Sequence, residues 1–293
     1  MISVVGNLRI NSLSRLNHFK DSFLSFHQLS DNWVINIRGT YRTAALEFIR
    51  QRLTHTLIEH SLLDDTKGWA VTTLAMMADV KYDYVLLWNE DHVNVANPDI
   101  FPQLIQEITT NAIDCLSYTW YHVPQDLGVP IATGTHIDTY WITPATWATS
   151  LGKNPSLYII SSPSIFRKSL LEKLLWEDIQ KWPWPLARIV RKISHLMSKL
   201  LATPSSPLFY KINSNLFSDR LPRFTKETPF NLEKEPHRTD YLPLRFGLLR
   251  QELFACIDDD LGTPGSSLLA RAPERLCYSK QVKESKETST HDR

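Results

Sequence analysis

An acidic group that follows an apolar run is the part of the sequence best suited to chemistry. Asn89, Glu90 and Asp91 come directly after the apolar segment 82–88, and His92 follows them. Carboxylate oxygens are ligands that Mg²⁺ and Mn²⁺ prefer, and these ions often take substrate phosphates as further ligands. The group therefore predicts a divalent-cation site. A solvated turn in which Asp or Asn caps a helix has the same composition, so both interpretations stay open.

The elements that must position this group alternate between strands and helices. Such alternation predicts an α/β fold with a mostly parallel sheet and helices on both faces. In sheets of this kind, ligands bind outside the carboxyl ends of the strands. Apolar and β-branched runs predict strands at 2–5, 33–38, 82–88 and 115–120, and apolar periodicity predicts helices from Ser14 through Phe26 and over 41–60, 72–80 and 99–110.

Polar residues also follow the first two predicted strands. Asn7 and Arg9 come after the first strand, while Asn36 and Arg38 end the second. A guanidinium can pair with a phosphate or stack on a base. We therefore expect Asn7, Arg9 and Arg38 to face a nucleotide, with surface charge at strand ends as the alternative.

The second half of the chain is less regular. We predict three parts: a main domain over 1–175, a helical or irregular extension over 176–278, and a disordered tail over 279–293. Within them we expect a loop-dominated stretch at 121–152, a strand at 157–160, helices at 166–180 and 186–201, an irregular stretch at 204–236 and a last ordered piece at 237–262.

A basic segment lies inside the predicted extension. Residues 179–218 contain no Asp or Glu, and the helix predicted at 186–201 has a basic face and an apolar face, with Trp182 and Trp184 before it. Such a helix can lie in a membrane interface that carries anionic lipids, or it can dock on the sheet as an ordinary amphipathic helix. We accordingly expect a cytoplasmic protein, peripheral on the inner face of the plasma membrane if the first interpretation holds.

Composition argues against several classes of protein. The 32 Lys and Arg residues balance 31 Asp and Glu residues to a net charge of +1, which speaks against a nucleic-acid binder. No apolar run reaches the ~18 residues of a membrane-spanning helix. Three distant cysteines make neither a disulfide framework nor a zinc motif, as is usual in a reducing compartment. The chain also lacks Gly-rich phosphate-binding motifs.

The order of the elements resembles the GT-A glycosyltransferases, in particular the family-two-like group. Their Asp-X-Asp motif follows such a strand and carries the metal of a nucleotide-sugar diphosphate. Trp88-Asn89-Glu90-Asp91 stands at the matching place, with Asn89 instead of the first acid. The resemblance implies a nucleotide-sugar donor, Mg²⁺ or Mn²⁺ held by Asp91, and Asn89 and Glu90 beside the donor.

A later segment, 160–174, is similar to the acceptor side of these enzymes. There a strand and a turn of small residues lead into a helix that begins with Phe-Arg, here Phe166-Arg167. A Glu-Asp pair often follows in the family, and the resemblance implies Asp178, or else Glu177, as the general base for the acceptor hydroxyl. Two charges on a solvated helix face are the alternative.

The resemblance thus implies an enzyme of polysaccharide biosynthesis that glycosylates a glycan or lipid-linked acceptor. A protein of the same fold that binds a glycan or partner without catalysis is the second hypothesis, and the departure at Asn89 favours it. An unrelated α/β protein is the third.

Overall fold

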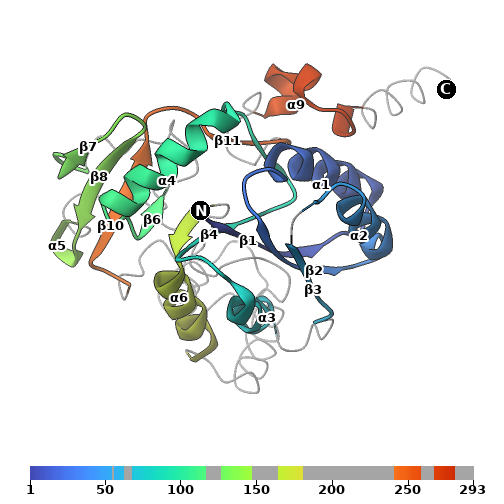
Figure 1. Ribbon diagram of the computed structural model, residues 1–293, viewed down its shortest axis with the longest axis horizontal. Helices are drawn as coiled ribbons and strands as arrows, with labels where there is room; N and C mark the ends of the chain where they lie inside the picture. Colours follow the sequence, from blue (N-terminus) through green and yellow to red (C-terminus); the bar gives the residue numbers. More distant parts are fainter. Residues whose placement is uncertain are drawn as a thin grey trace, which may run out of the picture.

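A mixed sheet of nine strands forms the centre of the described part of the chain (Figure 1). The computed structural model describes residues 1–54, 56–62, 68–116, 127–146, 164–180, 241–258 and 267–280, with only the backbone for 177–180. The strands follow the order β3-β2-β1-β4-β9-β6-β10-β8-β7. They are β1 (Ser3–Arg9), β2 (Asn32–Arg38), β3 (Thr56–His60), β4 (Tyr84–Leu87), β6 (Cys115–Leu116), β7 (Ala132–Thr133), β8 (Ile137–Ile142), β9 (Ser164–Arg167) and β10 (Leu244–Leu249).

All of these strands except β8 and β9 run in one direction, as their pairings show. The expectation of an α/β fold with a mostly parallel sheet flanked by helices is therefore confirmed. A separate ribbon pairs β5 (His92–Asn94) with β11 (Phe254–Cys256) in antiparallel fashion. This ribbon begins directly after the acidic group and so ties it to a segment from late in the chain.

Helices cover both faces of the sheet (Figure 1). Residues of α1 (Leu13–Phe26), α2 (Arg42–Arg50) and α4 (Phe101–Thr110) pack into one apolar cluster, and those of α3 (Trp69–Met76) and α6 (Lys168–Gln180) into another. In these helices the apolar residues recur every three or four positions, which creates one face for the sheet. The remaining short helices are η1 (Met77–Asp79), η2 (Pro98–Ile100), α5 (Pro144–Thr146), α9 (Leu268–Arg271) and η6 (Pro273–Arg275).

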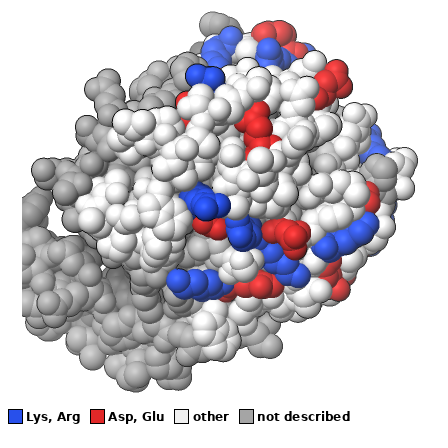
Figure 2. All heavy atoms as spheres, turned by 60° about the vertical axis from the view of Figure 1, so that its left-hand side comes forward, with Lys and Arg blue, Asp and Glu red and all other residues white. Residues whose placement is uncertain are grey.

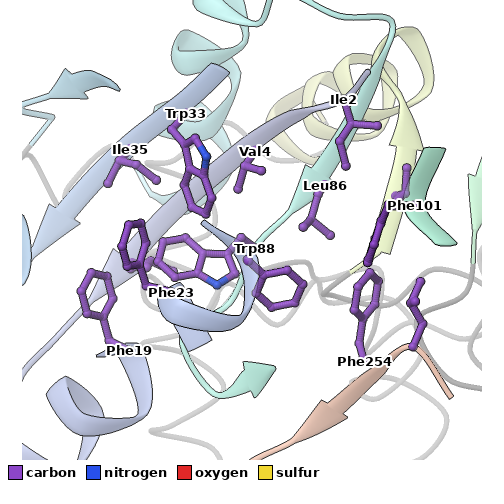
Figure 3. Packing of buried hydrophobic residues seen from close by; sticks show 14 of the residues in the cluster. Ile2, Val4, Phe19, Phe23, Trp33, Ile35, Leu86, Trp88, Phe101 and Phe254 are labelled. Carbon is purple, nitrogen blue, oxygen red and sulfur yellow. The ribbon is translucent and has the colours of Figure 1, made fainter. Parts of the chain in front are cut away.

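Aromatic side chains fill the core under α1 (Figure 3). The rings of Trp33 and Trp88 meet edge to face with centroids 5.4 Å apart, and Phe19 and Phe23 pack against Trp88. Gly6 of β1 lies below Trp88, and a Cβ at this position would lie 2.7 Å from the Trp88 ring. The glycine therefore makes the space that the indole occupies, next to the acidic group that follows Trp88.

The prediction of a helix over 41–60 is wrong for the second half of this range. α2 ends at Arg50, and residues 56–60 form the strand β3 beside β2. Leu53 and Leu57 continue the helical spacing, but β2 presents an open edge whose backbone groups β3 satisfies. The first helix also begins slightly earlier than expected, because Ser12 rather than Ser14 caps it and accepts a hydrogen bond from the Arg15 N–H.

The second half of the chain contributes more strand than expected. β7 and β8 lie in the stretch interpreted as loop at 121–152, and β9 occupies 164–167, where a helix beginning at Phe166 was expected. Within the expected extension 176–278, β10 lies inside the main sheet between β6 and β8. Ser279, placed in the expected tail, is buried. The boundary at residue 175 itself stays a prediction.

Several expectations lie outside the described residues. They are the strand at 157–160, the basic helix at 186–201, the irregular stretch at 204–236 and the tail beyond residue 280. None of the described helices is long and apolar enough to cross a membrane.

Charges of both signs mix on the described surface. Figure 2, which brings forward the side with β7 and β8, shows acidic and basic groups side by side without a large area of one sign. The strands on this side carry the ion pairs Arg167–Asp114 and Arg250–Asp138. The arrangement on this face agrees with the balanced composition.

Candidate functional site

The carboxyl ends of β1, β2 and β4 lie next to one another because these strands are parallel neighbours. Arg9, the last residue of β1, stands in register with Arg38, the last residue of β2. The acidic group follows β4 at the same edge. The structure therefore brings Arg9, Arg38 and the acidic group to one edge of the sheet, as the sequence predicted.

The turn after β2 is packed closely against the end of β1. The Arg38 carbonyl accepts a hydrogen bond from the Ile10 N–H at 2.8 Å, and the Ile10 carbonyl accepts one from Tyr41. Gly39 has a φ of 98°, a conformation that favours glycine. A Cβ at Gly39 would lie 2.3 Å from Asn11 Oδ1. The backbone around Arg38 is thus held in one arrangement, and the Arg38 side chain itself is buried.

The Asn7 side chain forms hydrogen bonds with α3 and with β2. Its Nδ2 donates to the hydroxyls of Thr72 and Thr73 at 2.7 and 2.9 Å and to the Trp69 carbonyl, while its Oδ1 accepts from Asn36. The amide is buried, and these bonds use both of its ends. Asn7 therefore joins the sheet to α3, and the structure places its side chain against this helix.

Glu90 is buried and forms an ion pair with Arg15 in the first turn of α1. Burial, followed by the negative charge of Asp91, raises the pKa of Glu90 to about 7, and the Arg15 charge opposes the shift. The charge of Arg15 favours the ionised carboxylate of Glu90, whereas burial favours the protonated form. Burial dominates because the Arg15 side chain is 55% exposed, so water screens its charge.

The pKa of Asp91 is shifted in the opposite direction to that of Glu90. Its Oδ1 lies 2.6 Å from Nδ1 of the buried His92. Burial alone would raise the pKa of Asp91, but the charge and hydrogen bond of His92 outweigh it and lower the pKa to about 2. The Asp91 side chain remains 37% exposed. The group thus offers one ionised, accessible carboxylate, while the Asn89 carbonyl accepts a hydrogen bond from Ser22.

The residues after β11 bring a further acid close to a histidine of α1. Cys256 of β11 pairs with His92, and the Ile257 N–H donates to the Asp91 carbonyl at 2.7 Å. Asp258 is the next residue, and its Oδ2 lies 3.8 Å from Nδ1 of the buried His18. The pairing of β11 with β5 places Asp258 near the acidic group, a contact that the sequence of α1 gives no sign of.

A polar stripe on α1 contacts the acidic group and the ribbon. Arg15, His18, Ser22 and Ser25 recur at helical spacing, each one position before a residue of the apolar stripe at 16, 19, 23 and 26. Ser22 Oγ donates to the His92 carbonyl, and Ser25 Oγ accepts from the Asn94 N–H. This stripe was not predicted, although it has the same periodicity as the apolar face of the helix.

The residues fit a cation only in part. Within the described ranges, no three His, Cys, Asp or Glu side chains are grouped so that they could hold a metal ion. Asp91 is ionised and partly exposed, whereas Glu90 pairs with Arg15. A single carboxylate suits Mg²⁺ or Mn²⁺ only where substrate phosphates supply further ligands.

The candidate base residues lie at the end of α6. This helix begins beside the amino end of β4, where the Lys168 N–H donates to the Asp83 carbonyl at 2.7 Å. Glu177 and Asp178 belong by their backbone to the last turn of α6, and their side chains are outside the described residues.

Comparison with known proteins gives partial structural similarity. No protein-family model and no curated protein sequence matches the chain. S. aureus TarS 1–349 in complex with UDP-GlcNAc is 13% identical over 59% of this chain and 47% of that chain, with a TM-score of 0.38. A mannosyltransferase from Pyrobaculum calidifontis in complex with GDP-Man and Mn²⁺ is 13% identical over 59% and 46%, with a TM-score of 0.36.

A third structure, the bifunctional glycosyltransferase WbbM, is 12% identical over 60% of this chain and 34% of that chain, with a TM-score of 0.35. The chain spans about half the length of the TarS 1–349 and mannosyltransferase chains that it matches, and a third of WbbM. The similarity therefore covers only part of each of these chains.

Proposed function

We propose that the chain is a GT-A-type glycosyltransferase that binds a nucleotide-sugar at the carboxyl edge of β1, β2 and β4. The observation that carries the proposal is the convergence of two arginines and one ionised carboxylate at this edge. Arg9 and Arg38 stand in register there, and Asp91 has a lowered pKa. Cationic side chains suit the phosphates of a nucleotide.

Each residue has a role in this proposal. Asp91 would hold Mg²⁺ or Mn²⁺ together with the donor diphosphate, where the ion would neutralise charge on the leaving group. Arg9 and Arg38 would contact the nucleotide, and Asn89 and Glu90 would border the sugar. Arg15, which is 55% exposed, is a further candidate for the diphosphate. Asn7 would support the site through α3 rather than by direct contact.

The transfer itself requires a base on the acceptor side. Asp178, or else Glu177, would take the proton from an acceptor hydroxyl. The hydroxyl oxygen would then form a bond to the anomeric carbon of the donor, and the bond from that carbon to the diphosphate would break. We propose a glycan or lipid-linked glycan as acceptor, and the inner face of the plasma membrane as the place of reaction, through the basic segment 186–201.

Thermal unfolding with nucleotide ligands tests the proposal. UDP-GlcNAc and GDP-Man are suitable first probes, each with and without Mn²⁺. A ligand at one hundred times its Kd stabilises the native state by ~2.7 kcal/mol, which corresponds to several degrees in Tm for a chain of this size. We expect stabilisation by one nucleotide with Mn²⁺, and its loss in Asp91→Asn.

Asp99→Asn is the matched control, because Asp99 is exposed and follows the acidic group by only a few residues. It should respond as the wild type does. If no nucleotide-sugar shifts the Tm of the wild type, with or without metal, the proposal is wrong.

A non-catalytic binding protein of the same fold is the second candidate. The observation in its favour is the acidic group itself, in which Asn89 replaces an acid and Glu90 is occupied by Arg15. This candidate predicts that a glycan raises the Tm in the absence of nucleotide, and that Asp91→Asn leaves the shift unchanged.

A further inference from the structure

A segment from the end of the described chain covers the ribbon that carries the acidic group. Residues 267–280, here called the clasp, contain α9 and η6. Leu268 and Leu276 of the clasp are buried in one cluster with Val93, Ala255 and Ile257 of the ribbon region. The Leu269 N–H also donates to the Ile257 carbonyl at 3.0 Å. The clasp thus packs directly on the ribbon.

The other end of the clasp is fixed to α1 by Asp21. The Asp21 carboxylate accepts the backbone N–H groups of Cys277, Tyr278 and Ser279 at 2.8, 3.0 and 2.7 Å, and the Ser279 hydroxyl at 2.6 Å. Both Asp21 and Ser279 are buried. Hydrogen bonds to an ionised acceptor are stronger than neutral ones, so this carboxylate is a strong anchor for the clasp.

Aromatic contacts reinforce the anchor. The Tyr278 ring meets the Phe48 ring of α2 edge to face with centroids 5.6 Å apart. Lys20 Nζ lies 5.0 Å from the centre of the Tyr278 ring. The anchor therefore depends on both helices of the first two βα units, although the clasp lies more than two hundred residues further along the chain.

The same helix that anchors the clasp also holds the acidic group. Ser22, next to Asp21 in the sequence, donates to the carbonyls of Asn89 and His92, and Ser25 accepts from the Asn94 N–H at 2.9 Å. The ribbon therefore contacts both α1 and the clasp, and Asp21 joins α1 to the clasp.

We propose that Asp21 is a positioning residue for the donor site: by anchoring the clasp, it holds the ribbon and so fixes the geometry of residues 89–94. The part of this inference that concerns donor binding rests on the proposed function. The part that concerns the ribbon does not, because it follows from contacts within the chain. The two parts can therefore be tested by separate measurements.

Hydrogen exchange and nucleotide binding in the full chain test the inference. In Asp21→Asn, one carboxylate oxygen becomes an NH₂ group that faces backbone donors, so the anchor should fail. Ser279→Ala removes one bond only and serves if Asp21→Asn does not fold. The matched control is Glu107→Gln, because Glu107 accepts the N–H groups of Thr135, His136 and Ile137 at 3.0–3.1 Å in the same manner, at the β7–β8 turn.

We expect amides in 89–95 of Asp21→Asn to exchange about tenfold faster or more, as for a locally weakened unit, and those in 131–139 to keep the wild-type rate. Glu107→Gln should show the reverse pattern. The affinity for UDP or GDP with Mn²⁺, whichever binds the wild type, should fall about tenfold in Asp21→Asn and stay unchanged in Glu107→Gln.

The outcomes separate the two proposals. Unchanged exchange over 89–95 in both Asp21→Asn and Ser279→Ala overturns the positioning role. If amides in 89–95 of Asp21→Asn exchange faster but the nucleotide affinity is unaltered, Asp21 does not position the donor site. If the wild type binds neither nucleotide, the exchange data still decide the role of the clasp, and only the proposed function fails.

Discussion

The guanidinium of Arg15 forms an ion pair with the carboxylate of Glu90, which lies 75 positions later in the chain. A cation in the first turn opposes the helix dipole of α1, and no acidic residue in that turn compensates it. Glu90 supplies the missing negative charge from outside the helix. The pair therefore joins the start of α1 to the turn that carries the acidic group, and it leads to the first prediction.

Arg15→Ala should destabilise the protein mainly through the carboxylate that it leaves behind. A buried charge that loses its partner is costly, but the exposure of Arg15 limits the effect, so we expect ~1 kcal/mol. Urea unfolding at pH 8 measures it. The same substitution in a Glu90→Gln background should cost clearly less, since no buried charge remains. Equal costs in the two backgrounds would show that the pair is not coupled.

The stability of the native state should depend on the protonation of Glu90. Its pKa is about 7 in the folded chain against an ordinary value of 4.5, so between these values the native state binds more protons than the unfolded state. The free energy of unfolding therefore falls as the pH rises through this window. Glu90→Gln should remove this part of the fall, and it should be more stable than the wild type at pH 8. Thermal unfolding of both proteins from pH 4.5 to 8 gives the difference curve, and a flat curve would contradict the prediction.

Asn7→Ala should lower the stability of the fold. The substitution leaves the buried hydroxyls of Thr72 and Thr73 without their amide partner, at a cost of about 1–3 kcal/mol. Urea unfolding measures the loss. Asn97→Ala is a suitable control, because Asn97 is exposed and its side chain caps the nearby Asp99 N–H. A loss no larger than in the control would mean that α3 is held by other contacts.

Gly6→Ala should disturb the aromatic core. The new Cβ would lie 2.7 Å from Trp88 and 3.1 Å from Ile35, and overpacking of this kind costs about 1–3 kcal/mol. The Trp88 ring would have to move, which should change the near-ultraviolet circular dichroism of the protein. An unchanged spectrum together with wild-type stability would show that the core has spare room.

The sequence predicted the strands β1, β2 and β4 of the main sheet and their shared edge, where we propose the donor site. The strands β1, β2 and β4 were visible as apolar runs, because they are buried on both faces and their side chains need no alternation. The group around Asp91 was found because its charges follow directly after such a run. The local pattern of apolar residues was sufficient to predict an element wherever the structure of a segment did not depend on a distant part of the chain.

Local pattern failed where a distant segment decided the outcome. Residues 56–60 have helical spacing but become β3, because β2 presents an open edge. β10 lies between β6 and β8, which no periodicity in 244–249 reveals. Asn7 could not be assigned to α3, since its partners Thr72 and Thr73 are more than sixty residues away. The role of the clasp was hidden for the same reason.

The position of β10 means that part of the main sheet can form only late in synthesis of the chain. β6 and β8 are made long before residues 244–249, and until β10 arrives they cannot form the pairings that it makes with both. A nascent chain that stops short of residue 249 therefore exposes unpaired strand edges, which favour association with other chains. The left half of the sheet in Figure 1 is accordingly completed late, so shortened versions of this protein should be made only with β10 included.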